Sequence, residues 1–278
     1  MRCAIVFEYI GTEFYGSQFQ PDKRTVQDEL NKALSIYFKE PVKVIPSGRT
    51  DAGVHSKGQV SHFEIKDRII DIRRVLYSLN SLLPDDISVK ELLVVNDKFH
   101  AQKSARYRYY RYTIINRPQR SAFDRHALYL REKLDLNLMN EALGYLLGEH
   151  DFSCFKAAKT DNPATVCNVY HARATRSGDY IYVDIIANRF LYNMIRILVG
   201  TVLDVGRLKF TPQFIKYLIS SKDRTQASST VSPDGLTFMF VGYDDISSYN
   251  NLEDLINNLP KLEEQLLKTQ YLAIKEAK

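Results

Sequence analysis

The hydrophobic pattern of this 278-residue chain gives the same order of elements twice, and that order limits the fold more than any single motif does. Apolar residues that alternate predict strands, and apolar residues three or four apart predict helices. Each half reads strand, helix, strand, strand, helix, strand, which is the order of a ferredoxin-like unit. We therefore predict an α+β fold of two ferredoxin-like (βαββαβ) halves, with antiparallel sheets joined around a central cleft.

In the first half, one helix is expected to begin at Thr25 and a second after Asp71, because both residue types cap helix N-termini. The second helix is expected to bury Ile72 together with the apolar residues one and two turns later. The strands predicted for this half are 3–9, 42–45, 59–65 and 87–94.

In the second half, helices are expected from Asp135, over residues 189–203, and after Thr211-Pro212, where proline suits the first helical turn. The predicted strands are 106–115, 166–175, 180–187 and 236–243. We predict domains at 1–103, 104–246 and 247–278. The last is a charged, glycine-free tail from Leu252 onward that reads as an amphipathic packing helix or oligomer contact.

Composition favours a globular protein with a substantial core, since 45% of residues are hydrophobic. Lys and Arg total 38 against 33 Asp and Glu, and the net charge of +5 is compatible with a polyanionic partner. Arginines and tyrosines alternate over 106–112, a combination suited to phosphates and bases.

The three cysteines, Cys3, Cys154 and Cys167, are far apart and form no Cys-x-x-Cys pair, so the sequence favours a reducing cytoplasm and predicts no metal site. No apolar run approaches the roughly 18 residues that a membrane helix needs. We expect an unexported protein with no membrane contact.

The segment 47–63 combines a carboxylate, a guanidinium and clustered glycines more tightly than any other stretch. Asp51 lies between Gly48 and Gly53, two residues after Arg49, and the glycines permit a turn that pushes the carboxylate into a cleft. The residues alone also allow a polar surface turn without chemistry.

This segment reads Gly-Arg-Thr-Asp-Ala-Gly-Val-His over 48–55, then Gly-Gln-Val over 58–60, and it resembles the active-site motif of the TruA-type tRNA pseudouridine synthase family. Further matches follow in the family's order over about the first 243 residues. They include Tyr9, Gly11, Tyr15-Gly16, Thr25-Val26-Gln27, Asn80, Leu83-Pro84, Phe99-His100-Ala101, Tyr110-Arg111-Tyr112, Asp151-Phe152, Asn188, Met194-Ile195-Arg196, Gly200 and Asp234-Gly235-Leu236.

Three positions depart from the family's pattern. Ile10 stands where an Asp is common, Ser17 where a Trp is frequent, and Cys167 where an Arg is usual. The loss of a cation at Cys167 changes how the chain would contact RNA backbone there. None of the three removes the candidate nucleophile.

The resemblance implies the pseudouridine synthase fold and a reaction that breaks the bond from uracil N1 to ribose and rejoins the base through C5. It implies uridines 38 to 40 in the anticodon arm of tRNA as targets and a homodimer as the working form. It implies no metal and no cofactor, and the chain carries no Walker loop, no dinucleotide-binding glycine motif and no His-Glu-x-x-His.

The resemblance also gives roles to four residues. Asp51 is the nucleophile, acting either by attack on the ribose carbon or through a glycal. Arg196 is expected to pair with Asp51, although the residues alone favour a surface arginine or an ordinary salt bridge. Tyr110 is expected to stack on the target uracil and assist removal of the C5 proton, and Arg49 to fill the space left by the extruded base or to grip a phosphate.

Two other functions fit parts of the pattern. A non-catalytic RNA-binding protein with tandem RRM-like domains would use Tyr107, Tyr109 and Tyr110 as stacking platforms. An aspartate-dependent hydrolase acting on a small sugar or phosphate would use Asp51 without any preference for tRNA. The enzyme differs from the binding module in needing the Asp51 carboxylate for turnover.

Overall fold

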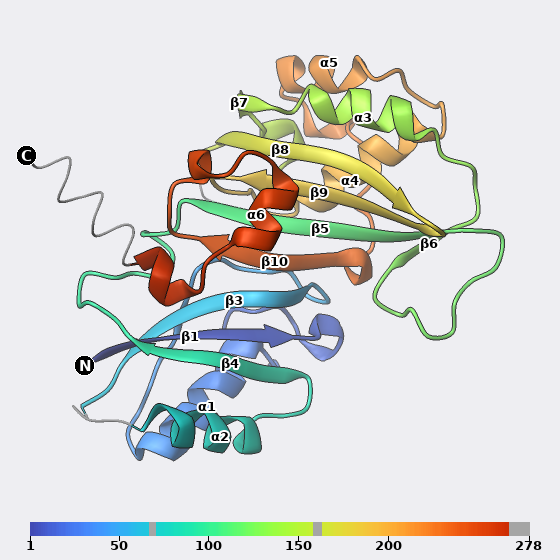
Figure 1. Cartoon of the computed structure of the whole chain (residues 1–278). Helices are drawn as coiled ribbons and strands as arrows, with labels where there is room; N and C mark the ends of the chain where they lie inside the picture. Colours follow the sequence, from blue (N-terminus) through green and yellow to red (C-terminus); the bar gives the residue numbers. More distant parts are fainter. Residues whose placement is uncertain (67–70, 158–162, 267–278) are drawn as a thin grey trace, which may run out of the picture. The chain divides into compact units, whose positions relative to one another are not determined.

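The computed structural model describes residues 1–66, 71–157 and 163–266, and these cluster by their contacts into two compact units (Figure 1). Unit 1 comprises Met1–Arg108 and Phe238–Lys278, and unit 2 comprises Tyr109–Thr237. The class is α+β, as the sequence predicts. The division into folding domains at 1–103, 104–246 and 247–278 stays a prediction.

Unit 1 is built on an antiparallel sheet in which β1 (Arg2–Tyr9) lies between β3 (His55–Glu64) and β4 (Ile87–Val94). The order is β4-β1-β3-β10, with β10 being Leu236–Gly242, and β2 (Ile45–Pro46) also pairs with β3. Of the strand predicted at 42–45, only Ile45 is in a strand. The backbone N–H groups of Val42 and Val44 bond instead to side chains of the first helix.

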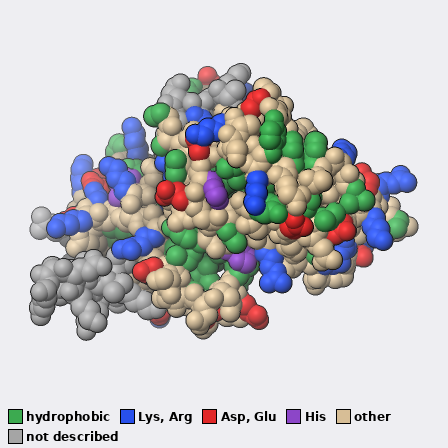
Figure 2. Space-filling view, turned by 90° about the horizontal axis from the view of Figure 1, so that it is seen from above, with side chains coloured by type: hydrophobic (Ala, Val, Ile, Leu, Met, Phe, Trp, Pro, Cys, Tyr) green, Lys and Arg blue, Asp and Glu red, His purple; other side chains and the backbone are tan. Residues whose placement is uncertain are grey.

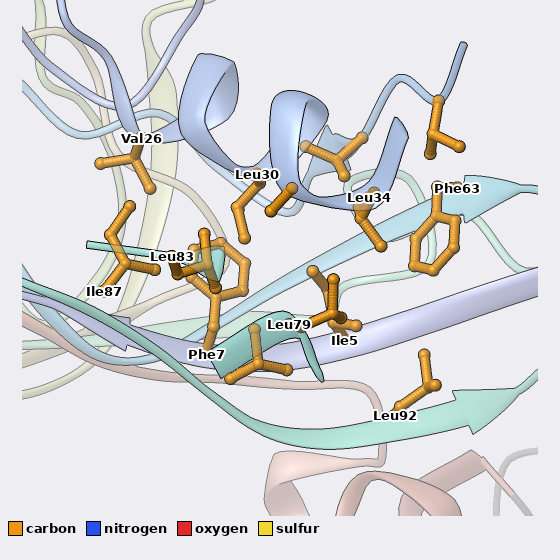
Figure 3. Packing of buried hydrophobic residues seen from close by; sticks show 14 of the residues in the cluster. Ile5, Phe7, Val26, Leu30, Leu34, Phe63, Leu79, Leu83, Ile87 and Leu92 are labelled. Atoms are coloured by element: carbon orange, nitrogen blue, oxygen red, sulfur yellow. The ribbon is translucent and has the colours of Figure 1, made fainter. Parts of the chain in front are cut away.

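Two helices cover one face of this sheet, α1 (Val26–Phe38) and α2 (Ile72–Leu82). Thr25 and Asp71 cap them, each accepting a backbone N–H of the first turn, so both predicted starts are confirmed. Leu30, Leu34 and Leu79 point from the helices onto the sheet (Figure 3). Ile72 was expected in this core but is 38% exposed, because it directly follows the cap, before the helix turns its apolar face inward.

Unit 2 contains most of β5 (Tyr107–Asn116), then β9 (Tyr180–Ala187), β8 (Val166–Ser177) and β7 (Gly148–Asp151) in the order β5-β9-β8-β7. Strands β7 and β8 and strands β8 and β9 pair antiparallel. A short strand, β6 (Leu128–Leu130), runs parallel to β5. The sequence pattern did not predict β6 or β7, since each is too short for a clear alternation.

The helices of unit 2 are α3 (Leu136–Gly144), α4 (Met194–Gly206) and α5 (Phe214–Ser221). Asp135 caps α3 as predicted. The expected helix over 189–203 begins only at Met194, because Asn193 adopts a left-handed conformation with φ 57°. Arg189 and Asn193 therefore precede α4 and do not share a helical stripe with Arg196. The described residues also contain five short 3₁₀ turns, at Gly11–Glu13, Ser153–Phe155, Arg224–Gln226, Pro233–Gly235 and Ile246–Ser248.

The tail after β10 is fixed to unit 1 by buried polar contacts. Asp244 accepts hydrogen bonds from the hydroxyls of Tyr107 (2.8 Å) and Tyr249 (2.6 Å). The buried side chain of Gln265 accepts the N–H of Tyr243 at 2.9 Å. Helix α6 spans only Leu252–Asn258, ahead of Pro260, and residues 267–278 of the predicted helical tail lie outside the described residues.

Helical asparagines satisfy strand groups that have no strand partner. Asn80 of α2 donates to the carbonyl of Val89 at 2.9 Å and accepts its N–H at 2.8 Å. Asn140 of α3 makes the same pair of bonds to Ala174, at 2.9 and 2.8 Å. Val89 lies in β4, at the end of the sheet order, where open backbone groups would otherwise invite another chain to pair.

Two further findings concern the state of the cysteines and the possibility of a membrane-spanning helix. Cys3, Cys154 and Cys167 are all buried and form no disulfide. Across 1–66, 71–157 and 163–266, no helix combines the length and the apolar content that crossing a membrane would require.

We predict that Asn80→Ala lowers the free energy of unfolding by about 1–2 kcal/mol, because two hydrogen bonds of about 1 kcal/mol each are lost. Urea denaturation followed by circular dichroism measures this. Asn137→Ala is the matched control, since Asn137 is an exposed asparagine of α3. Equal destabilisation by both variants would contradict the role given to Asn80.

Candidate active site

The loop that carries Asp51 joins β2 to β3, and its first residues are tied to β3. The N–H of Ser47 donates to the carbonyl of Val60 at 2.8 Å, and its hydroxyl donates to the side chain of Gln59 at 2.5 Å. The amide of Gln59 in turn donates to the carbonyl of Gly48 at 3.1 Å. The loop therefore leaves the sheet in one fixed direction.

Its last residues are held against the segment after β1. Gly53 has φ 81°, a conformation that favours glycine, and its N–H points to the carbonyl of Phe14 at 3.4 Å. The N–H of Gly11 donates to Nδ1 of His55 at 3.0 Å. A Cβ at Gly11 would lie 2.0 Å from the carbonyl oxygen of Val54, so only glycine permits this approach.

Thr50, the residue before Asp51, is clamped by three hydrogen bonds. Its N–H donates to the hydroxyl of Ser17 at 2.8 Å, and its carbonyl accepts the N–H of Ser17 at 3.1 Å. Its own hydroxyl lies 2.7 Å from the hydroxyl of Tyr9. Burial raises the pKa of Tyr9 to about 12, so this phenol keeps its proton at neutral pH.

The clamp decides which side chains of the loop face outward. Thr50 is buried, Asp51 is half-buried and Arg49 is exposed. The backbone on both sides of Asp51 is hydrogen-bonded, and the N–H of Val54 turns back to the carbonyl of Asp51 at 3.2 Å. The loop thus presents a carboxylate on a backbone whose position is set by its neighbours in unit 1.

Four tyrosines lie on β5, and the structure separates Tyr110 from the others. Tyr107, Tyr109 and Tyr112 are fully buried, whereas Tyr110 is 8% exposed and meets the ring of Phe190 edge-on, with centroids 5.1 Å apart. The hydroxyls of Tyr107, Tyr109 and Tyr112 donate to Asp244, Asp184 and the carbonyl of Ser232, respectively. Tyr107 and Tyr109 are therefore not stacking platforms for bases.

The arginines of the same segment also serve the fold. Arg111 binds the buried carboxylate of Asp184 with two nitrogens, at 2.7 and 3.1 Å. Arg108 donates to the carbonyls of Ser47, Gln102 and Ala105. The alternation of arginine and tyrosine in the sequence suggested a surface for phosphates and bases, but most of these side chains are used internally. Asp184, which sequence reasoning missed, organises two of them.

Arg196 lies in the first turn of α4, and two interactions of its guanidinium are defined within unit 2. Its Nε donates to the carbonyl of Val231 at 2.8 Å, and one terminal nitrogen donates to the side chain of Asn193 at 2.9 Å. The segment around Val231 packs closely on α4, because a Cβ at Gly200 would lie 2.4 Å from the carbonyl oxygen of Ser229. Asp51 belongs to unit 1, so its pairing with Arg196 stays a prediction.

The histidines near the motif accept hydrogen bonds from the backbone. Nδ1 of His55 accepts from Gly11, and Nδ1 of His62 accepts the N–H of Ala101 at 3.1 Å. Nδ1 of His100 accepts two backbone N–H groups of the following turn. In the part of the chain that the structure describes, no cluster of His, Cys, Asp and Glu side chains is suited to a metal ion.

On the face seen in Figure 2, Lys and Arg side chains lie among Asp and Glu side chains and form no single large basic patch. The net charge of +5 by itself gives only a weak general attraction to a polyanion.

The fold and the loop define a mixed α+β protein that presents one fixed carboxylate from a glycine-rich turn. The family model for tRNA pseudouridine synthase matches residues 5–102 and 142–244. The chain belongs to this family, and it is accordingly a pseudouridine synthase, an intramolecular isomerase.

Individual relatives match at similar levels. The chain is 41% identical over 247 residues to tRNA pseudouridine synthase A of Aliivibrio salmonicida, with 87% of this chain and 93% of the relative covered. It is 44% identical to the enzyme of that name from Bacillus licheniformis, covering 88% and 99%. It is 42% identical to tRNA pseudouridine synthase A of Bacillus subtilis, with 88% of this chain and 100% of the relative covered.

Among solved structures, the chain is similar to one titled "Crystal Structure of a Cbf5-Nop10-Gar1 Complex", with 11% identity and a TM-score of 0.32. The match covers 90% of this chain and 62% of that chain. At that score the two chains share too little geometry to define a common architecture.

Because the chain belongs to this family, the enzyme is favoured over the non-catalytic RNA-binding protein. The buried rings of Tyr107 and Tyr109 also cannot stack on bases, as the RNA-binding protein would require. Of the departures from the family's pattern, Ser17 has become part of the Thr50 clamp and Ile10 is 42% exposed. Cys167 is buried in β8, and burial raises the pKa of its thiol to about 11, so it supplies no charge.

We predict that His62 makes stability depend on pH on the acid side. Burial, together with the charges of His100 and Arg2, lowers the pKa of His62 from 6.5 to about 4, against smaller opposing effects of a hydrogen bond with the backbone of Ile45 and of the Glu64 carboxylate. As the pH falls from 6.5 to 4, His62 is protonated in the unfolded chain but stays neutral in the folded chain. The contribution of His62 to the free energy of unfolding is therefore fully present above pH 6.5. Between pH 6.5 and 4 it decreases by up to about 1.4 kcal/mol for each unit that the pH falls.

Urea unfolding at several pH values tests this with His62→Asn, which retains an acceptor for Ala101 and does not titrate. The slope between pH 6.5 and 4 should be shallower in this variant than in the wild type. Parallel profiles for wild type and His62→Asn would exclude His62 as the source.

We further predict that Ser17→Ala lowers kcat by roughly 10- to 100-fold while changing KM for tRNA less than twofold, because the Thr50 N–H loses its acceptor and the next residue, Asp51, is held less accurately. Ser17→Thr, which keeps the hydroxyl, should restore much of the activity. Ser35→Ala is the control, because the Ser35 hydroxyl also accepts one backbone N–H, that of Val42 at 2.9 Å. Equal losses of kcat in Ser17→Ala and Ser35→Ala would show a general effect on stability.

Proposed function

We propose that this protein converts uridine to pseudouridine at positions 38 to 40 of the anticodon arm of tRNA, with Asp51 as its nucleophile. The observation that carries the proposal is the Gly-Arg-Thr-Asp-Ala-Gly-Val-His motif of a family member, on a loop whose backbone is clamped on both sides of the carboxylate. The name tRNA pseudouridine synthase A, borne by the relatives, supports tRNA as the substrate.

The reaction is balanced without a redox partner. The bond between ribose C1′ and uracil N1 breaks, the base turns, and a bond forms between C1′ and C5. The proton on C5 passes to water, and N1 gains a proton. An ionised aspartate acts in one of two ways. It bonds to C1′ and is displaced when C5 bonds there, or it removes the C2′ proton so that a glycal forms and returns this proton to C2′ when C1′ bonds to C5.

The surrounding residues are proposed to act in three ways. Arg196 pairs with Asp51 and keeps it ionised, and its guanidinium is pre-oriented by Val231 and Asn193. Tyr110 stacks on the extruded uracil and assists removal of the C5 proton. Arg49, which is exposed, fills the vacated stack or grips a phosphate, so that the few kcal/mol needed to extrude the base are offset.

The finer architecture belongs to the same proposal. We infer two ferredoxin-like halves joined around a central cleft that receives the uridine, in the pseudouridine synthase fold. The order β1, α1, β2, β3, α2, β4 in unit 1, with β2 and β1 both paired to β3, supports the first half. We also propose that the protein works as a homodimer in the cytoplasm, where its buried cysteines stay reduced.

We predict that Asp51→Asn abolishes turnover but leaves tRNA binding unchanged or slightly tighter, because a negative charge near phosphates is removed. Unmodified tRNA carrying tritium at uridine C5 releases it to water when the new bond forms. Asp85→Asn serves as the control, since Asp85 is an exposed aspartate before β4. Undiminished release by Asp51→Asn would refute the nucleophile assignment.

The products formed from tRNA also distinguish the isomerase from the remaining alternative, an aspartate-dependent hydrolase. A hydrolase would liberate free uracil or cut the substrate, whereas the isomerase returns an intact chain that contains pseudouridine. Chromatography of the digested product distinguishes these results.

A further inference from the structure

The loop Tyr15–Lys23, between β1 and α1, lies directly against the backbone of Asp51. Gly16 has φ 95°, and a Cβ there would meet the carbonyl oxygen of Thr50 at 3.1 Å and the carbonyl carbon of Asp51 at 3.6 Å. The N–H of Ser17 also bonds to Thr50. Both segments belong to unit 1. A side chain that leaves this loop next to Gly16 therefore starts from backbone that packs against the backbone of Asp51.

The loop is held in place by internal hydrogen bonds. The N–H of Tyr15 donates to the carbonyl of Arg24 at 3.0 Å, and the side chain of Gln20 donates to the carbonyl of Tyr15 at 2.6 Å. The N–H of Phe19 donates to the side chain of Gln27, in the first turn of α1, at 2.8 Å. The backbone is fixed, so the side chains it presents are pre-organised.

This fixed loop nevertheless leaves two aromatic rings in solvent. Tyr15 is 55% exposed and Phe19 is 51% exposed. Most single exposed aromatic residues need no explanation, and Tyr77 on α2 is 78% exposed. Two such rings on one short loop that packs against the backbone of Asp51 are a different case, since flat rings are what unstacked bases bind.

A cation accompanies the first ring. Nζ of Lys23 lies 4.5 Å from the centroid of the Tyr15 ring. Its neighbour Arg24 is occupied by Asp86, at 2.8 Å, and by the ring of Phe14. Asp22 is the one acidic residue of the loop, and within the described ranges no ion pair with Lys23 is formed. The loop therefore offers a ring that is 55% exposed, with an ammonium group over one of its faces, a combination that matches a base and its phosphate.

We propose that Tyr15 and Lys23 form a second RNA contact, in which the Tyr15 ring stacks on an unstacked nucleotide flanking the target uridine and Lys23 binds the phosphate of that nucleotide. The proposal rests on the proposed function, because it requires the target uridine at Asp51. Its physical purpose is to hold the neighbour of an extruded base, which has lost a stacking partner when the target leaves the helix.

The test separates binding from turnover by using Asp51→Asn as the parent, which binds without reacting. Tyr15→Ala in this parent should weaken binding of an unmodified tRNA transcript by about 5- to 150-fold, the effect of losing one base–aromatic stack. Tyr15→Phe, which keeps the ring, should bind within about twofold of the parent. Tyr77→Ala is the matched control, and it should also bind like the parent. Thermal unfolding verifies that each variant folds.

The dependence of tRNA binding on salt concentration tests the role of Lys23. Lys23→Gln should lower the slope of log Kd against log salt concentration by about 0.7 to 1, as expected for one lost phosphate contact, while Tyr15→Ala should leave that slope unchanged. An unchanged slope in Lys23→Gln would remove the phosphate contact. Unchanged affinity in Tyr15→Ala, or an equal loss in Tyr77→Ala, would overturn the stacking contact.

These results are independent of the nucleophile assignment. If Asp51→Asn still releases tritium from uridine C5, the proposed function fails whatever Tyr15 does. If Asp51→Asn is inactive and Tyr15→Ala binds tRNA as tightly as its parent, the second contact fails while the proposed function stands.

Discussion

The hydrogen bonds that clamp Thr50 are the interactions on which the site depends. Ser17 bonds to both the N–H and the carbonyl of Thr50, and Tyr9 bonds to its hydroxyl. A loop between two strands would otherwise sample many conformations and would place a carboxylate only loosely. Because the clamp lies under the loop, Asp51 is carried outward on a fixed backbone, and the loop Tyr15–Lys23 is fixed beside it by the same bonds.

Close backbone packing makes this arrangement possible. Gly11 and Gly16 lie where a side chain would collide with, or press upon, the residues around Asp51. Tyr9 is fully buried in the first strand, and its raised pKa keeps the phenol neutral, so the clamp does not change between acid and mildly alkaline solution. The core beneath, from Ile5 and Phe7 to Leu30 and Leu34, supplies the rigidity that these bonds require (Figure 3).

Local signals in the sequence were sufficient where the structure is locally determined. Thr25, Asp71 and Asp135 cap helices as predicted, because a cap bonds to backbone within three residues. The start of α4 was misplaced, since the left-handed turn at Asn193 leaves no mark in the apolar periodicity. The tail from Leu252 was predicted to be helical, and within the described residues its helix α6 ends at Asn258, ahead of Pro260.

The sequence by itself determined the family, the α+β class and the motif that carries Asp51, because these depend on residue types and spacing along the chain. Only the tertiary structure decided which aromatic and charged side chains remain available. Tyr109 and Arg111 are occupied by Asp184, from a strand more than seventy residues away, whereas Tyr15 and Lys23 stay at the surface. A buried carboxylate attracts whichever donors the fold brings to it, and spacing along one strand does not reveal that partner.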